Sequence, residues 1–382
     1  MISLPTSSGE FETYELREPV LWERPASASA TRIGYAAAHV VADPLADNSP
    51  GRPAAIDWDA TLRFRRHLWS YGLRVADAMD TAQRGMGLDW AAIQELVRRS
   101  AAEARSFGDP AGLLACGAGT DQAPAAATLD EIVAAYSEQI DLVQETGATV
   151  ILMASRRLAA LAAGPDDYQA VYGRLLQRVD RPAILHWLGD MFDPALTGYW
   201  GSADLDTATA SLLELIGDHA ALIDGVKVSL LDADREIAIR SALPDGVKLY
   251  TGDDYNYPSL IGSGSHALLG VFDAIAPAAA AALQALDAGD LARYEEVFGP
   301  TVPLARKIFE PPTYHYKTGL VFLAWLAGHQ THFRMVGGLE SARSVPHLVR
   351  LFELADQAGL LPDPELAVAR TRAWLTVQGV PS

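Results

Sequence analysis

The chain has 382 residues, of which 49% are hydrophobic and 20% charged. That is more than a single barrel of about 250 residues needs. Its formal net charge of −18 argues against a nucleic-acid-binding or anionic-membrane-binding surface, because both need clustered Lys and Arg. The single cysteine, Cys116, excludes an internal disulfide and a thiolate-based zinc site.

The first residues lack the basic and apolar regions of a signal peptide. The apolar runs at residues 278–282 and 320–327 are too short or too interrupted to cross a membrane. We therefore expect a cytoplasmic protein with no nucleic-acid partner and no membrane partner. Residues 1–31 mix charges with Pro19 and Pro25, which predicts an N-terminal extension that can include a short hairpin.

From residue 32 onward, short apolar segments alternate with amphipathic ones. Asp57 is expected to cap a helix over residues 57–68, and Asp89 a helix that ends near residue 103. Further helices are predicted over residues 129–145 and 168–178. Eight mostly apolar segments are the predicted strands: residues 33–39, 73–79, 113–119, 149–153, 182–187, 226–230, 247–251 and 266–272.

Eight such strands alternating with helices indicate an α/β fold with a parallel sheet, and eight is the number that closes a TIM (β/α)8 barrel. We predict this barrel over residues 32–277. The alternative is an open doubly wound sheet, which favours a glycine-rich turn after the first strand; residues 36–42 contain no glycine. Residues 278–382 predict a C-terminal helical region, where we expect the subunits of a homo-oligomer to pack. Its predicted helices cover residues 279–288, 291–298, 302–309, 319–327 and 345–358.

The reacting groups of a TIM barrel come from the C-terminal ends of its strands and the loops that follow. Gln83, Ser155 and Asp254 are each interpreted as capping or loop residues that are exposed to water. The remaining polar side chains are expected to converge on one mouth, since buried polar groups need partners and a site is the usual reason for gathering them. The polar residues at these positions are His39, Asp80, Thr81, Gln83, Arg84, Ser155, His186, Lys227, Ser229, Thr251, Asp253 and Asp254.

Lys227 is the most informative of these residues. Strand alternation places it on one face with Gly225 and Ser229, and a buried lysine needs a partner or a use. The simpler interpretation is a strand-end lysine that extends its amine to solvent or pairs with Asp224 or Asp232. The other interpretation is an amine that burial keeps neutral, so that it attacks a carbonyl.

Three segments late in the predicted barrel form a series: Gly225-Val-Lys-Val-Ser-Leu-Leu-Asp232, Thr251-Gly-Asp-Asp254 and Gly270-Val-Phe-Asp-Ala-Ile-Ala276. This series resembles strands six, seven and eight of the dihydrodipicolinate synthase and N-acetylneuraminate lyase family. Shorter matches extend the resemblance, in order, over about residues 32–361: Thr146-Gly-Ala-Thr-Val-Ile-Leu-Met153, Arg181-Pro-Ala-Ile-Leu-His186 and Leu286-Asp-Ala-Gly-Asp290.

The resemblance implies a lyase of the class I aldolase type, or a dehydratase. In such an enzyme Lys227 forms a Schiff base with a 2-keto acid, such as pyruvate or a keto-deoxy sugar acid. Where the family has a proton-relaying tyrosine on strand five, this chain has His186, whose ordinary pKa of about 6.5 suits that task. The family's Gly-Thr-Thr-Gly-Glu turn is replaced by residues 79–85, in which only Thr81 matches. Asp80 would repel a carboxylate, so either Arg84 compensates or the substrate is not a simple pyruvate.

From this resemblance we predict a small-molecule substrate, no cofactor, Lys227 and His186 as catalytic residues, and no metal ligands. The predicted substrate-binding residues are His39, Asp80, Thr81, Arg84, Ser229, Thr251 and Asp253. The loop over residues 190–204, which carries Phe192, Tyr199 and Trp200, is longer than the family's. It either shapes a sugar-sized pocket or is a surface loop with a packed aromatic lid.

Two other functional classes stay open. One is a metal-dependent TIM-barrel sugar isomerase or hydrolase that uses His39, Asp80, His186 and Asp253 as ligands, since these residue types suit zinc or manganese. The other is a ligand-binding homologue that has lost the chemistry, which is consistent with the missing tyrosine.

Overall fold

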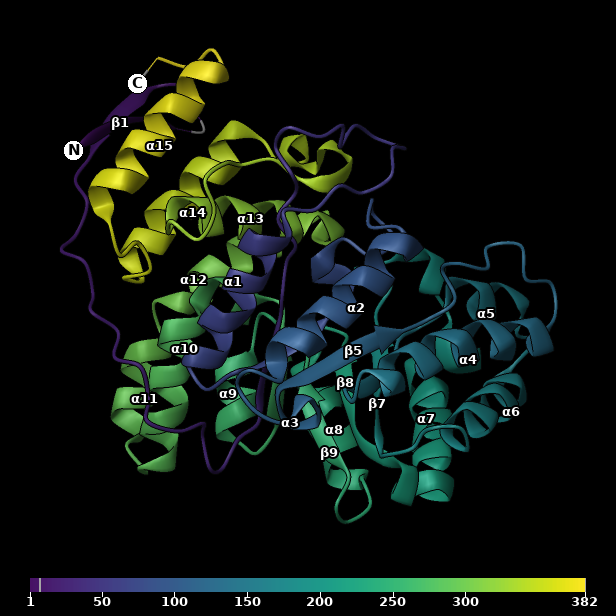
Figure 1. The fold of residues 1–382 in the computed structure, drawn as a ribbon. Helices are drawn as coiled ribbons and strands as arrows, with labels where there is room; N and C mark the ends of the chain where they lie inside the picture. The colour runs from purple at the N-terminus through teal and green to yellow at the C-terminus, as the bar shows by residue number, and fades with distance from the viewer. Residues whose placement is uncertain (7, 382) are drawn as a thin grey trace.

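The computed structural model describes residues 1–6 and 8–381, and its centre is a closed barrel of eight parallel strands (Figure 1). Each strand pairs with the next one in the chain, and the last pairs with the first. The predicted TIM barrel is confirmed, and the open-sheet alternative is wrong. The strands are β3 (Gly34–Ala37), β4 (Arg74–Asp77), β5 (Leu114–Ala118), β6 (Thr149–Leu152), β7 (Ala183–Leu188), β8 (Ile223–Ser229), β9 (Lys248–Thr251) and β10 (His266–Leu269).

The helices between the strands cover the outside of the barrel. Asp57 and Asp89 cap the first two of them, as predicted, by accepting hydrogen bonds from the backbone N–H groups of Ala60 and Ala92. These helices are α1 (Trp58–Ser70), α2 (Trp90–Ala104), α3 (Pro110–Leu113), α4 (Leu129–Glu145), α5 (Arg156–Leu161), α6 (Pro165–Leu176), α7 (Leu205–His219), α8 (Ala233–Ala242) and α9 (Tyr257–Gly262).

The inside of the barrel is packed with side chains. Two tyrosines on the strands that flank β10, Tyr35 on β3 and Tyr250 on β9, meet edge to face with their ring centroids 5.8 Å apart. The same buried cluster contains Ala37, Met79, Ala76, Ala115, Ile151, Met153, Ile184 and Leu268. Because this core closes the barrel, chemistry is confined to the C-terminal ends of the strands.

Six helices follow the last strand, and Figure 1 shows α13, α14 and α15 grouped at one end of the molecule, beyond the barrel. The predicted boundary at residue 277 falls inside the first of the six. The last was not predicted from the sequence. They are α10 (Val271–Asp287), α11 (Leu291–Phe298), α12 (Thr301–Ile308), α13 (Tyr316–Leu326), α14 (Val345–Gln357) and α15 (Pro364–Val377).

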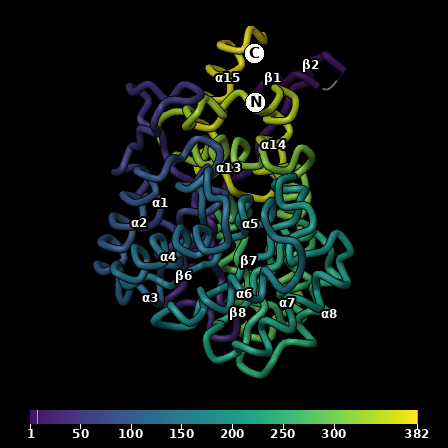
Figure 2. Tube along the Cα trace, turned by 90° about the vertical axis from the view of Figure 1, so that its right-hand side faces the viewer, coloured from purple at the N-terminus to yellow at the C-terminus, as the bar shows by residue number. Residues whose placement is uncertain are grey.

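The N-terminal extension lies against these C-terminal helices. It begins with an antiparallel hairpin of β1 (Ile2–Pro5) and β2 (Phe11–Tyr14), and both chain ends lie at the same end of the molecule (Figure 2). The Tyr14 hydroxyl donates a hydrogen bond of 2.8 Å to Asp356, and the Trp22 indole donates one of 2.8 Å to the Gly359 carbonyl. The extension is thus fastened to α14 and to the turn after it.

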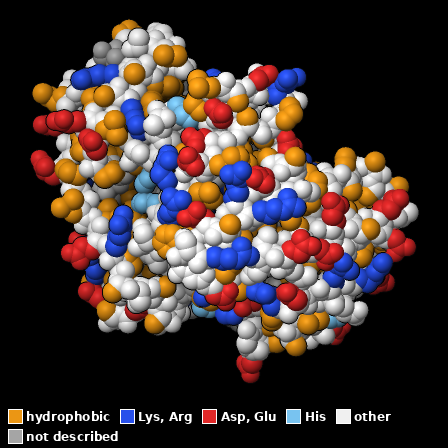
Figure 3. Space-filling view, in the orientation of Figure 1, with side chains coloured by type: hydrophobic (Ala, Val, Ile, Leu, Met, Phe, Trp, Pro, Cys, Tyr) orange, Lys and Arg blue, Asp and Glu red, His pale blue; other side chains and the backbone are white. Residues whose placement is uncertain are grey.

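Figure 3 shows Lys and Arg side chains interspersed with Asp and Glu over one face of the molecule. Within the described part of the chain, no helix is both long and apolar enough to span a bilayer.

Candidate active site

Lys227 lies on β8 with its side chain inside the barrel, near the C-terminal mouth. Its neighbours in register are His186 on β7 and Tyr250 on β9, and it is 7% exposed. Gly252 leaves the space that the Lys227 side chain occupies, and Gly225 leaves space for the ring of the neighbouring Tyr250. A Cβ on Gly252 would lie 2.9 Å from Lys227 Cε, and one on Gly225 would lie 2.8 Å from the Tyr250 ring. Neither position accepts a side chain while the lysine and the tyrosine stay where they are.

The two aspartates that flank the strand do not pair with Lys227. Asp224 accepts hydrogen bonds of 2.6 Å from Lys248 Nζ and from the Tyr250 hydroxyl. Asp232 caps α8. The interpretation of Lys227 as a lysine paired with either aspartate is therefore wrong, and among the described residues no carboxylate forms an ion pair with its amine.

The electrostatic surroundings of Lys227 favour a reactive amine. Burial lowers the pKa of Lys227, and the negative charges of Asp80 and Asp254 act in the opposite direction. Asp254 is itself buried, which raises its pKa to about 7, while a hydrogen bond from the Val271 backbone N–H stabilises its carboxylate. A lysine with a lowered pKa carries a larger share of the neutral amine, which is the nucleophilic form.

The space above the Lys227 amine is narrow. It is a cavity of about 10 Å³, which holds about one water molecule. Phe192, Phe309 and Tyr316 cover it; the rings of Phe309 and Tyr316 stack with centroids 4.5 Å apart, and Phe192 meets Tyr316 edge on. The remaining lining residues are Ala37, Met79, Asp80, Thr81, Leu188, Lys227, Ser229, Asp254 and Gly270.

One side of this cavity carries a pair of hydroxyl groups. Thr81 Oγ1 lies 2.8 Å from the hydroxyl of Tyr316, and both side chains are buried. Burial and the charge of Asp80 raise the pKa of Tyr316, which keeps the phenol protonated. Thr81 follows β4, whereas Tyr316 opens α13. The pair therefore joins a barrel loop to the C-terminal region.

His186 is buried under the site and does not line the cavity. Its Nε2 lies 3.3 Å from Ser229 Oγ, and its Nδ1 has no hydrogen-bond partner among the described residues. Burial, with the positive charge of Lys227, lowers the pKa of His186 well below its usual value. The imidazole is therefore neutral, and it reaches the cavity through Ser229.

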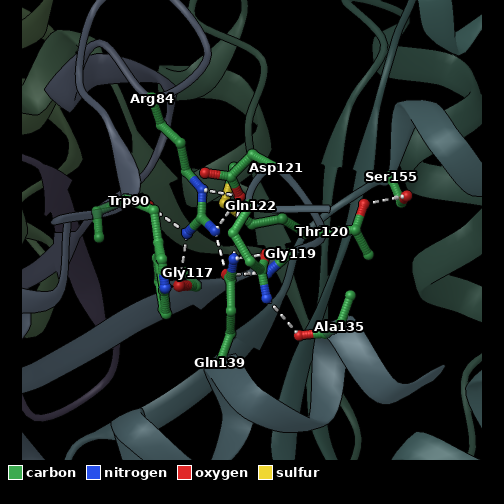
Figure 4. A network of polar contacts seen from close by, with 12 residues as sticks. Arg84, Trp90, Gly117, Gly119, Thr120, Asp121, Gln122, Ala135, Gln139 and Ser155 are labelled. Carbon is green, nitrogen blue, oxygen red and sulfur yellow. Dashed lines mark hydrogen bonds and ion pairs between the residues drawn. The ribbon is translucent and has the colours of Figure 1, made fainter. Parts of the chain in front are cut away.

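Arg84 does not pair with Asp80, the carboxylate whose charge it was expected to compensate. Its Nη1 donates to the carbonyls of Ala78 and Gly117, its Nε donates to Asp121 at 3.0 Å, and its Nη2 contacts Gln139 (Figure 4). Asp121, and not Asp80, balances the charge of this guanidinium. Arg84 thus fixes the loops after β4 and β5 to each other.

A larger pocket of about 280 Å³ lies next to the Lys227 cavity, since Asp80 and Leu188 line both. Its wall comes from the loops after β4, β5, β6 and β7. The other lining residues are Arg84, Gly85, Gly119, Thr120, Asp121, Pro124, Met153, Ala154, Ser155, Arg156, Arg157, Asp193 and Leu196.

Three predicted substrate-binding residues line neither cavity. His39 Nδ1 bonds to Asp273 at 2.8 Å, Thr251 donates to Glu236, and Asp253 accepts hydrogen bonds from the backbone N–H groups after it. In the part of the chain that the structure describes, no three His, Cys, Asp or Glu side chains are grouped as a metal site. The four ligands of the metal-dependent alternative are therefore not brought together.

The other predicted residues meet at the mouth, together with some that were not predicted. Asp80, Thr81, Lys227 and Ser229 share the small cavity, and Asp80 and Arg84 share the larger pocket. Sequence reasoning missed Asp254, which was interpreted as a loop residue, and Tyr316, which lies outside the barrel sequence. Only the adjacent Asp-Asp pair after β9 signalled Asp254, and nothing in the sequence signalled Tyr316.

Four non-glycine residues adopt left-handed backbone conformations, and all four lie in loops after barrel strands: Ala78, Gln83, Trp200 and Leu231, with φ of 52°, 65°, 68° and 54°. Such conformations cost about 1–3 kcal/mol each and persist where the surroundings fix them, which is common at functional sites. The loops after β4, β7 and β8 are therefore held in set shapes around the mouth.

Solved structures with the same fold confirm the predicted resemblance at the level of the fold. YagE from E. coli K12, a prophage protein of the dihydrodipicolinic acid synthase family in complex with pyruvate, is 12% identical with a TM-score of 0.68, over 87% of this chain and 100% of that one. Dihydrodipicolinate synthase from Aquifex aeolicus is 15% identical with a TM-score of 0.62, over 86% and 99%. The enzyme from Bacteroides thetaiotaomicron is 14% identical with a TM-score of 0.64, over 85% and 99%.

No curated protein matches the chain. A family model does match, over residues 2–380, and its description is "Protein of unknown function (DUF993)". Because this match covers almost every residue, the chain belongs to the DUF993 family.

Proposed function

We propose that this protein is a class I lyase or aldolase that acts on a 2-keto acid or keto-deoxy sugar acid, with Lys227 as the Schiff-base nucleophile. The observation that carries the proposal is a buried lysine with no carboxylate partner at the C-terminal mouth of the barrel. The fold supports it, since YagE, which has this fold, is described in complex with pyruvate.

The proposed reaction begins when the neutral amine of Lys227 attacks the keto carbon, C2. The C2 oxygen takes a proton from the Tyr316 phenol and leaves as water, which gives an iminium ion and a phenolate. In a substrate with a 4-hydroxyl group, the bond between C3 and C4 then breaks. Its electron pair moves toward the iminium to form an enamine, the hydroxyl loses its proton, and an aldehyde departs. Protonation of C3 and hydrolysis of the imine release the shorter keto acid and restore Lys227.

This reaction needs a group that moves a proton beside the imine. The hydroxyl pair of Thr81 and Tyr316 lines the same cavity as Lys227. Once it has given its proton to the departing water, the Tyr316 phenolate can take the proton of the 4-hydroxyl as the aldehyde departs; the phenol then protonates C3 of the enamine and recovers a proton when water hydrolyses the iminium, so that both hydroxyls of the pair are regenerated. His186, the relay predicted from the sequence, would have to act through Ser229. We therefore assign the proton transfer to Tyr316.

The first prediction tests Lys227 directly. The protein is incubated with pyruvate and with a panel of 2-keto-3-deoxy sugar acids, reduced with borohydride, and digested for peptide mass analysis. We expect the added mass on Lys227, and none in Lys227→Ala. Lys248→Ala is the matched control, because Lys248 lies on the next strand but pairs with Asp224, and it should keep the adduct.

Absence of an adduct with every acid would contradict the proposal. Turnover that a chelator abolishes and that Lys227→Ala retains would favour the metal-dependent alternative. Keto-acid binding without adduct or turnover would favour the ligand-binding homologue.

A further inference from the structure

The space above Lys227 is too small for a substrate, and the pocket beside it is not. A cavity of about 10 Å³ accommodates about one water molecule. The adjoining pocket has a volume of about 280 Å³ and shares Asp80 and Leu188 with that cavity. A molecule with its keto carbon at Lys227 therefore has room for its other end in this pocket, which we call the arginine pocket.

The arginine pocket offers both hydroxyl and charged groups. Thr120 Oγ1 and Ser155 Oγ lie 2.6 Å apart on its wall, and both are buried. Leu188 and Leu196 form an apolar part of the lining. A wall of this kind suits a chain that carries hydroxyl groups, since each hydroxyl can both donate and accept.

All three side-chain nitrogens of Arg84 donate hydrogen bonds within the protein. Two other arginines at the rim of the pocket, Arg156 and Arg157, keep some donors free of partners in the described part of the chain. Arg156 pairs through Nε with Asp193 at 2.5 Å, and its Nη atoms lie 3.4 and 3.5 Å from where a Cβ of Gly85 would be. Arg157 donates through Nε and Nη2 to the carbonyl of Ala126. Both Nη groups of Arg156, and Nη1 of Arg157, donate no hydrogen bond among the described residues. These free donors can bind an anion.

Two buried tyrosines, Tyr199 and Tyr172, fix the position of the pocket wall that carries these arginines. The Ser155 backbone N–H donates 3.0 Å to the Tyr199 hydroxyl, which also lies 2.8 Å from the hydroxyl of Tyr172. Tyr199 and the left-handed Trp200 belong to the long loop after β7, and the same loop supplies Asp193 and Leu196 to the pocket. The loop therefore builds the pocket in addition to covering Lys227.

We propose that the arginine pocket binds the far end of the substrate, and that this end is a hydroxylated chain that terminates in an anionic group, a carboxylate or a phosphate, held by Arg156. This inference rests on the proposed function, because it takes the keto carbon to lie at Lys227. It defines the substrate as a doubly anionic 2-keto sugar acid.

Binding of molecules that cannot react tests this inference apart from catalysis. The probes are gluconate, glucarate and 6-phosphogluconate, which have no keto group and end in a neutral hydroxyl, a carboxylate and a phosphate. Isothermal titration should show one or both of the doubly charged probes binding about tenfold or more tightly than gluconate. The tighter of the two identifies the terminal group. Arg156→Ala should remove the difference. Arg174→Ala, which removes an exposed arginine paired with Asp130 on the outer side of the barrel, should keep it.

Equal affinity for all three probes, no binding of any probe, or a preference that survives in Arg156→Ala would overturn the inference. Borohydride trapping with pyruvate separates its failure from that of the proposed function. Pyruvate is too short to reach the arginine pocket, so its trapping on Lys227 in the wild type tests the proposed function without involving that pocket. Loss of that adduct in the wild type would count against the proposed function, whatever the titrations show.

Discussion

Tyr316 and His186 are both candidates for the proposed proton transfer beside the imine, and their surroundings differ. The phenol of Tyr316 lies in the wall of the Lys227 cavity, bonded to Thr81, while the imidazole of His186 is separated from it by Ser229. Because proton transfer requires contact with the reacting group or one intervening water, position ranks ahead of pKa in choosing between them.

We predict that Tyr316→Phe lowers kcat by about a hundredfold or more, while pyruvate is still trapped on Lys227. The substitution removes one oxygen and keeps the ring that stacks on Phe309, so the cavity stays covered. Steady-state kinetics and peptide mass analysis of the same preparation check both parts.

His186→Phe is the comparison variant. A large loss of kcat in His186→Phe together with normal turnover in Tyr316→Phe would return the relay to the histidine, as the sequence predicted. Equal losses of trapping in both variants would indicate a disturbed cavity and no relay role for either.

Strand alternation let the sequence predict which side chains of the strands point toward the candidate site. Lys227 follows from its place between Gly225 and Ser229, and Thr81 follows from the family's turn after strand two. Strand alternation does not predict side-chain directions in loops, so it did not indicate that Arg84 pairs with Asp121 and not with Asp80. Tyr316 depends on how the C-terminal helices pack on the barrel, which no local pattern records.

A buried glutamate, Glu236, lies where helix α8 packs against strand β9. Glu236 accepts hydrogen bonds from Thr251 and Ser265, and burial raises its pKa to about 8, with a further contribution from Asp253. The folded protein therefore holds a proton on Glu236 at pH values where the unfolded chain has lost it.

We predict that the wild type loses stability relative to Glu236→Gln as the pH rises from about 5 to 8. A raised pKa in the folded state means that the folded chain binds more protons in this window, so the free energy of unfolding falls with pH. The difference is on the order of 3 kcal/mol. Urea denaturation at several pH values measures it.

Glu214→Gln, at an exposed position of α7, should follow the wild type across the same range. Parallel stability curves for wild type and Glu236→Gln would show that Glu236 does not hold the proton.

The sequence predicted the barrel elements well, for a physical reason. Each strand is buried on both sides, so its residues form an apolar run, and Asp57 and Asp89 mark helix starts by the bonds that they accept. The left-handed conformations of Ala78 and Trp200 carry no such signal, since neither residue favours positive φ. The shapes of the loops around the mouth therefore had to come from the structure.

At the scale of the whole molecule, the N-terminal extension and the C-terminal helices stabilise each other. Asp356 on α14 is buried and accepts hydrogen bonds from the Tyr14 hydroxyl and the Arg17 backbone N–H. Trp22 fastens the next part of the extension to Gly359. The expected packing of subunits through this region stays a prediction.

We predict that Asp356→Ala lowers the free energy of unfolding by about 1–3 kcal/mol, because it leaves two donors without their acceptor. Urea denaturation measures the change, and limited proteolysis should cut the extension faster than in the wild type. Glu295→Ala, at an exposed position of α11, is the control and should alter neither. Unchanged proteolysis in Asp356→Ala would mean that the extension is held by other contacts.

The aromatic cover over Lys227 has a consequence for the timing of the proposed reaction, in which Lys227 forms an imine with a keto acid. Because Phe192, Phe309 and Tyr316 leave room for about one water, a keto acid meets the amine only while the cover is open. Imine formation then has a maximum rate, set by how often the cover opens, and more keto acid cannot raise it. While the cover is closed, bulk water cannot reach the imine. One movement would thus govern both how fast the covalent intermediate forms and how long it lasts.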